Sequence, residues 1–125
     1  METLNQISYD IIGASFKVHS ALGPGLLESA YEVCMEHELL KIGYKVERQK
    51  PLPVTYDGVK LDAGYRIDLL VEDSVVVELK SVNEMIPIYK AQVMTYLKLA
   101  DLKLGLLMNF NVTDMQKGIT RIVMY

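Results

Sequence analysis

The amino-acid sequence predicts an α/β or α+β fold with a mixed central β-sheet. Two segments with helical periodicity come first, a strand-like hairpin and two strongly apolar runs follow, and a third helical segment precedes two more strand-like runs. Helices and strands in this order bury their apolar sides by packing against one another in layers. We therefore expect a central sheet flanked by helices on both faces.

The composition fits one folded domain spanning residues 1–125. Half of the residues are hydrophobic and 23% are charged, with only four prolines and eight glycines. Such a composition excludes a disordered or fibrous chain. A chain of this length buries roughly two-thirds of its unfolded surface, which is enough for a single core.

The charge and the cysteine content limit the classes of partner. The formal net charge is −3, so the chain lacks the broad positive field that supplies most non-specific affinity for duplex nucleic acid. The single cysteine, Cys34, excludes an internal disulfide and a multi-thiolate zinc site. The sequence contains neither a signal-peptide pattern nor a membrane-spanning run, and we expect a cytoplasmic protein without membrane contact.

Two helices are expected before any strand. The first has an apolar stripe at steps of three and four residues and is ended by the Gly-Pro-Gly run at 23–25. The second ends before Gly43. The stripe of the first helix consists of Leu4, Ile7, Ile11, Ala14, Val18 and Leu22, and that of the second of Leu26, Ala30, Val33, His37 and Leu40.

The strand-like segments follow from alternation and from turn residues. Residues 51–62 alternate around Asp57-Gly58, which is a strong signal for a short hairpin turn. Residues 65–71 and 75–80 are rich in branched aliphatic side chains and predict central strands covered on both faces. Residues 103–110 and 118–125 are two more strand-like runs.

The third helix is expected to begin near Pro87, a residue that suits a first helical turn. Its predicted stripe, which should face the sheet, consists of Ile88, Gln92, Tyr96 and Leu99.

Three charged side chains, Asp68, Glu78 and Lys80, interrupt the central strands. A two-residue turn at 72–73 would point Asp68 away from Glu78, whereas a three-residue turn at 72–74 would set the two carboxylates opposite each other. The second register is favoured because it gathers one wholly apolar face and leaves the charges on the other. That apolar face would consist of Ile67, Leu69, Val71, Val75, Val77 and Leu79.

Opposed carboxylates indicate a site for a hard divalent cation, because they repel one another unless a cation lies between them. Mg²⁺ or Mn²⁺ binds oxygen ligands from one or two carboxylates, together with waters and substrate phosphates. Lys80 would lie beside the ion, where an ammonium can orient an attacking water or stabilise charge on a phosphoryl oxygen. The alternative is structural: Asp68 forms an ion pair with Lys80 or Arg66, and Glu78 lies at a solvated strand end.

The spacing from Asp68 across nine residues to Glu78-Leu79-Lys80 resembles the core motif of the PD-(D/E)XK nuclease superfamily. The resemblance implies a restriction-endonuclease-like core, Asp68 and Glu78 as metal ligands, and Lys80 as the catalytic lysine. The proline of the superfamily motif is replaced here by Ile67. Along nearly the whole chain, Gly25-x-x-Glu28-x-x-Tyr31 and the strand motifs are also similar to the bacterial GxxExxY protein family, which is grouped with these nucleases.

The resemblance brings in three more residues. Glu28 lies in the expected first turn of the second helix, where a helix carboxylate completes the metal shell in related nucleases; the alternative is an acid favoured by the helix dipole. Gln92 and Tyr96 resemble the Gln-x-x-x-Tyr element of RecB-type nucleases, which implies contact with substrate or with the metal shell. Their alternative is an amide and a phenol tied into the core by hydrogen bonds.

The resemblance implies a Mg²⁺-dependent (or Mn²⁺-dependent) endo- or exodeoxyribonuclease that hydrolyses phosphodiester bonds of DNA, with RNA as a second substrate class. The alternative function is a non-catalytic binding or assembly domain that keeps the nuclease scaffold and acts with a protein partner. The acidic net charge and the lack of a Lys/Arg run favour this alternative. A homo-oligomer also stays open.

Overall fold

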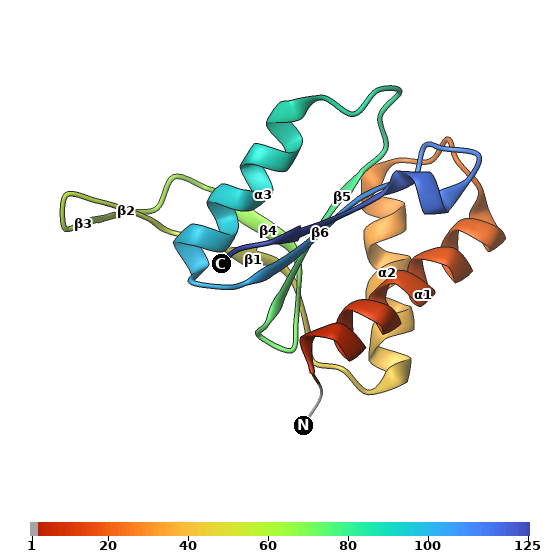
Figure 1. The fold of residues 1–125 in the computed structure, drawn as a ribbon, viewed down its shortest axis with the longest axis horizontal. Coiled ribbons are helices and arrows are strands. Elements are labelled where there is room, and N and C mark those ends of the chain that lie inside the picture. Colours follow the sequence, from red (N-terminus) through yellow and green to blue (C-terminus); the bar gives the residue numbers. More distant parts are fainter. Residues whose placement is uncertain (1–2) are drawn as a thin grey trace.

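The computed structural model describes residues 3–125 as three α-helices, a five-stranded sheet, a separate two-stranded hairpin and a short 3₁₀ helix (Figure 1). In chain order the elements are α1 (Leu4–Leu22), α2 (Glu28–Ile42), β1 (Val46–Pro51), β2 (Val54–Tyr56), β3 (Val59–Leu61), β4 (Arg66–Val71), β5 (Val75–Lys80), α3 (Pro87–Ala100), β6 (Leu104–Asn109), η1 (Met115–Gly118) and β7 (Ile119–Val123). The central sheet has the order β1-β4-β5-β6-β7. Only β5 and β6 are parallel neighbours, which confirms the predicted α+β fold with a mixed sheet.

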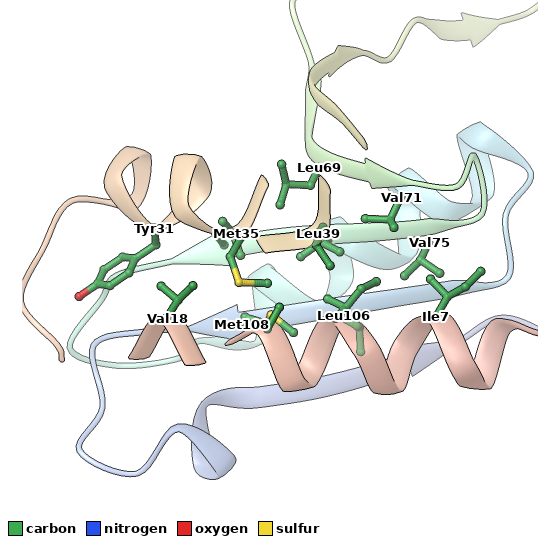
Figure 2. Close-up of a cluster of buried hydrophobic side chains, with 14 of the residues drawn as sticks. Ile7, Val18, Tyr31, Met35, Leu39, Leu69, Val71, Val75, Leu106 and Met108 are labelled. Carbon is green, nitrogen blue, oxygen red and sulfur yellow. The ribbon is translucent and has the colours of Figure 1, made fainter. Parts of the chain in front are cut away.

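The helices cover both faces of the sheet, as expected, with α1 and α2 on one face and α3 on the other (Figure 1). Figure 2 shows the larger core, where side chains of α1 and α2 meet the sheet. On the α3 side, Val93 and Leu97 pack against Val76 and Leu107. Each fully buried aliphatic side chain contributes about 1.5–3 kcal/mol. Within residues 3–125, no helix combines the length and the apolar character that crossing a bilayer requires.

The predicted stripe of α1 is confirmed for its four central residues, Ile7, Ile11, Ala14 and Val18, which are buried. Leu4 and Leu22, at the two ends of the helix, are exposed. The helix begins where the Thr3 hydroxyl accepts a hydrogen bond from the Gln6 main chain at 3.1 Å.

The predicted stripe of α2 is wrong. The structure buries Tyr31, Glu32, Met35 and Leu39 instead, and Val33 and Leu40 are about half exposed. Apolar side chains occur all around this helix, so periodicity does not identify the face that packs against α1 and the sheet. The correction matters because it places a carboxylate, Glu32, inside the protein.

The hairpin prediction is confirmed: β2 and β3 pair through a two-residue turn at Asp57 and Gly58, both with positive φ. The hairpin projects away from the body of the molecule (Figure 1). Strand β1 was not predicted. It is an edge strand with a polar sequence, VERQKP, and polar side chains on an edge strand hide the alternation by which strands are recognised.

The stripe predicted for α3 is only partly correct. The helix begins at Pro87, as expected, but its buried residues are Val93, Tyr96 and Leu97, whereas Ile88 is 62% exposed. Gln92 is half-buried. The face that carries Ile88 and Gln92 therefore borders the sheet instead of packing squarely against it.

Candidate functional site

The turn between β4 and β5 contains three residues, Glu72, Asp73 and Ser74, as the favoured register requires. Main-chain pairing runs from Val71↔Val75 to Leu69↔Val77, and Glu72 and Asp73 have φ values of 53° and 51°. Lys45 holds the turn, because its main-chain nitrogen donates to the Glu72 carboxylate at 2.6 Å and its ammonium lies 2.9 Å from Asp73. If the register is continued by one residue beyond Leu69↔Val77, Asp68 lies opposite Glu78.

At this position the two carboxylates bind the main chain of the opposite strand. Oε2 of Glu78 accepts a hydrogen bond from the Asp68 nitrogen at 2.7 Å, and Oδ2 of Asp68 accepts one from the Leu79 nitrogen at 2.9 Å. The two strands are thus joined by side chains beyond the Leu69↔Val77 pair. Each carboxylate is held in place by the strand that carries the other.

The predicted apolar face of β4 is wrong at one residue. Ile67 packs in the core on the α3 side, whereas Leu69 and Val71 pack on the α1 and α2 side. The alternation of β4 is therefore broken between Ile67 and Leu69. On the neighbouring strand, Gln49 has a φ of 56° at the same level of the sheet, a value uncommon for a residue other than glycine. The irregularity lets the Asp68 side chain reach the α2 side, so the charges do not all share one face.

Asp68 lines a small pocket of about 140 Å³ together with Glu28, Ser29, Glu32, Gln49 and Leu79. Glu32 accepts a hydrogen bond from the Gln49 amide at 2.5 Å, and the same nitrogen lies 3.3 Å from Oδ1 of Asp68. Burial raises the pKa of Glu32, and the charge of Asp68 raises it further, against the lowering effect of the Gln49 hydrogen bond. Glu28 lies in the first turn of α2, as predicted, and is exposed.

Glu78 is buried, with 6% of its surface exposed. Burial is the main cause that raises its pKa to about 8, and the charge of Asp68 is the next. The hydrogen bond from the Asp68 nitrogen and the charge of Lys80 act in the opposite direction. A carboxyl group with this pKa is mostly protonated at neutral pH unless a cation is added beside it.

On the α3 side, a larger pocket of about 710 Å³ contains Lys80, Gln92 and Tyr96. The Lys80 ammonium lies 4.5 Å from the centre of the Tyr89 ring, and the Gln92 amide donates to the Tyr96 hydroxyl at 3.2 Å. Burial raises the pKa of Tyr96, and the charge of Glu78 is the second cause. Glu78 shares its side of β5 with Lys80 and Val76 and therefore lies on the α3 side, while its partner Asp68 lines the small pocket.

Both structural alternatives for the strand charges are contradicted among the residues that the structure describes. Asp68 forms no ion pair with Lys80 or Arg66, since neither cation occurs in the ion pairs of residues 3–125. Glu78 does not lie at a solvated strand end, because it is buried. In the part of the chain that the structure describes, no cation is therefore ion-paired to either of these two carboxylates.

The donor set fits one divalent cation better than a closed protein cage. Among residues 3–125, no three His, Cys, Asp or Glu side chains converge as a group that could hold a metal ion. Mg²⁺ usually takes only one or two carboxylates and fills its shell with waters and substrate phosphates. Asp68 and Glu78, which bond to each other's strand, could supply these one or two carboxylates, and an added cation would offset the repulsion between them.

Two residues of the site were missed by the sequence interpretation, Glu32 and Gln49. Glu32 was missed because the wrong face of α2 was expected to be buried, and Gln49 because β1 was not recognised as a strand. The one available signal was spacing: Glu32 follows Glu28 by four residues and therefore lies on the same side of the helix.

Tyr31 of the Gly-x-x-Glu-x-x-Tyr motif holds the loop between α1 and α2 in place. Its hydroxyl donates to the Gly23 carbonyl at 2.6 Å and accepts from the Leu26 nitrogen at 3.1 Å, and its ring stacks on Phe110. The Ser81 hydroxyl donates to the Leu26 carbonyl at 2.6 Å. The loop between α1 and α2 is thereby tied to the end of β5, next to Lys80.

Comparison with known proteins assigns the family. A model of the PD-(D/E)XK nuclease superfamily matches residues 5–122, which is nearly the whole chain. Neither curated proteins nor solved structures include a significant match. The match includes both carboxylate strands and the helix with Gln92 and Tyr96, and the chain therefore belongs to the PD-(D/E)XK nuclease superfamily.

Proposed function

We propose that this chain hydrolyses phosphodiester bonds of DNA with the help of Mg²⁺ or Mn²⁺ held by Asp68 and Glu78. The observation that carries the proposal is the pair itself. A buried carboxyl group, with its pKa raised to about 8, lies beside a second carboxylate, and no cation within residues 3–125 is ion-paired to either of them. Such an arrangement is costly unless it binds a ligand of positive charge.

Lys80 follows Glu78 by two residues on the same strand and lines the larger pocket. Its ammonium donates hydrogen bonds to an attacking water or to a phosphoryl oxygen and stabilises the negative charge that develops there. When bound, the metal ion supplies Lewis-acid stabilisation of the same charge. The Tyr89 ring beneath the ammonium keeps it at this position by a cation–π contact.

The remaining residues act in support. Tyr96 accepts a hydrogen bond from Gln92, and its own hydroxyl proton stays available to a substrate oxygen because its pKa is raised. On the α2 side, Glu28 and Glu32 line the pocket next to Asp68. We assign Glu28 to the outer metal shell, and Glu32 with Gln49 to holding Asp68 in place.

The test measures cleavage of labelled single- and double-stranded DNA and RNA by the purified chain, with Mg²⁺, Mn²⁺ or EDTA. We expect cleavage with either metal and none with EDTA, and loss of cleavage in Asp68→Asn and Glu78→Gln. Linear and circular substrates distinguish exo- from endonuclease activity. Glu38→Gln is the matched control, because Glu38 pairs with Lys17 and Lys41 away from the site.

One observation favours the second function, a non-catalytic assembly domain with a protein partner: the net charge of −3 gives little general attraction to nucleic acid. If the wild-type chain binds neither metal ion and cuts none of the substrates, the nuclease proposal fails and this alternative takes its place.

A further inference from the structure

We propose that the larger pocket beside Lys80 binds an unstacked nucleobase, so that single-stranded nucleic acid is the preferred substrate. This inference rests on the proposed nuclease function and specifies its substrate class. The pocket has a volume of about 710 Å³, which falls within the range of small-molecule sites. Its walls come from α3, from β2, from the end of β5 and from Tyr65, just before β4.

Three tyrosines line this pocket, Tyr65, Tyr89 and Tyr96. Tyr65 is 47% exposed, and its ring is held edge-on against Tyr96 at a centroid distance of 6.2 Å. Tyr89 has the Lys80 ammonium on one face. Exposed and positioned aromatic rings are the usual stacking surface for bases of single strands, because every base has a flat π-face.

Polar groups accompany the rings. Gln92 and Thr95 also line the pocket, and their amide and hydroxyl groups offer donors and acceptors to the edge of a base. The apolar side chains Val54, Ile88, Ala91 and Leu99 complete the lining. An apolar pocket with a few polar groups and aromatic walls suits a flat, partly polar ring better than it suits a phosphate.

The pocket is continuous with the candidate catalytic residues, because Lys80 and Tyr96 belong to both. A base stacked on the exposed Tyr65 ring would bring its adjoining phosphate toward Lys80 and the carboxylates. A paired base cannot enter without leaving its stack, which costs free energy in a duplex and little in a single strand. The acidic net charge also makes stacking, rather than phosphate contacts, the main source of affinity.

The experiment measures binding by fluorescence anisotropy in EDTA, so that no strand is cut. The probes are an oligothymidylate, an oligouridylate, an abasic strand of equal length and charge, and a DNA duplex. We expect the wild-type chain to bind the base-containing strands about tenfold or more tightly than the abasic strand and the duplex. Comparison of the two homopolymers distinguishes DNA from RNA.

Tyr65→Ala should remove most of this preference, and Tyr65→Phe should keep it. Tyr9→Ala is the matched control, since Tyr9 is an exposed tyrosine of α1 on the opposite side of the sheet. Circular dichroism of each variant verifies folding.

Equal binding of base-containing and abasic strands, or tighter binding of the duplex, would overturn the inference. Base-dependent binding without any metal-dependent cleavage would instead overturn the nuclease function and keep the pocket. Metal-dependent cleavage without base-dependent binding would keep the nuclease function and overturn the base pocket.

Discussion

Oε2 of Glu78 lies 2.7 Å from the main-chain nitrogen of Asp68, and this hydrogen bond joins two strands at the point where one of them loses its regular alternation. The Asp68 carboxylate returns a bond to the neighbouring strand at Leu79. Both carboxylates are therefore hydrogen-bonded in place in the ligand-free chain. Rigid ligands lower the entropic cost of binding a cation, at the expense of stability when the cation is absent.

The first prediction concerns stability and pH. Below the ordinary pKa of 4.5, Glu78 is protonated in both the folded and the unfolded chain; between 4.5 and about 8, only the unfolded chain loses the proton. The free energy of unfolding of the metal-free protein should therefore fall by about 1.4 kcal/mol per pH unit as pH rises through this window. Above pH 8 it should stay constant. Chemical denaturation in EDTA at pH 5, 7 and 9 measures the change.

Glu78→Gln should remove most of this pH dependence. Glu32→Gln should remove a smaller part, because the pKa of Glu32 is also raised. Parallel pH profiles for the wild type and Glu78→Gln would show that Glu78 does not carry the effect.

The second prediction concerns metal binding. A bound cation favours the ionised form of Glu78, so binding of Mg²⁺ at pH 7 should release a proton. The affinity should rise from pH 6 to about pH 8 and then stay constant. Isothermal titration calorimetry in two buffers with different ionisation enthalpies measures the released protons, and a titration at pH 9.5 should show almost none. Binding without proton release at pH 7 would contradict the raised pKa.

The third prediction separates catalysis from metal binding. Lys80→Met should lower the rate of cleavage by about 10²-fold or more, because the ammonium stabilises developing charge, while Mg²⁺ still binds. Since the Lys80 charge lowers the pKa of Glu78, the variant should also need a higher pH for full metal affinity. Loss of the contact with Tyr89 changes stability by only about 0.5–1 kcal/mol.

Lys90→Met provides the control for Lys80, because Lys90 is an exposed lysine of α3. An equal loss of activity in both variants would mean that general charge, and not the position of Lys80, matters.

The fourth prediction concerns the close packing of Gly118 against Asn109, at the end of β6. A Cβ at Gly118 would collide with the main-chain oxygen of Asn109 and lie 3.1 Å from Val112, so Gly118→Ala should destabilise the fold by about 2 kcal/mol or more. Asn109 in turn holds the main chain of Val82, just beyond β5. Denaturant melts and residual cleavage activity are the measurements.

Gly13→Ala is the opposite case. Gly13 lies in the interior of α1, and an added Cβ would meet nothing within 4 Å. The substitution should stabilise the protein by about 0.5–1 kcal/mol. If Gly118→Ala is as stable as the wild type, the predicted collision with Asn109 is contradicted; a destabilised Gly13→Ala would contradict only the expectation for α1.

Local patterns predicted much of the fold and part of the site. The stripe of α1 has one clear apolar side, and the Asp57-Gly58 turn has residues that accept positive φ, so both could be recognised from neighbouring residues alone. The buried face of α2 could not be recognised in this way, because apolar residues surround the helix. Strand β1 could not either, because an edge strand need not alternate.

The sequence by itself favoured the register of Asp68 and Glu78, since the apolar alternation on both sides of the turn is a local pattern, and the structure confirms the three-residue turn. The sequence also determined the superfamily motif. Only the tertiary structure decided that Glu32 and Gln49 join Asp68 and that Lys80 lies on Tyr89. These contacts join residues of different secondary-structure elements, and they depend on which side of each helix packs against the sheet. That choice is made by the whole core at once, because burial is a property of all the packed elements together.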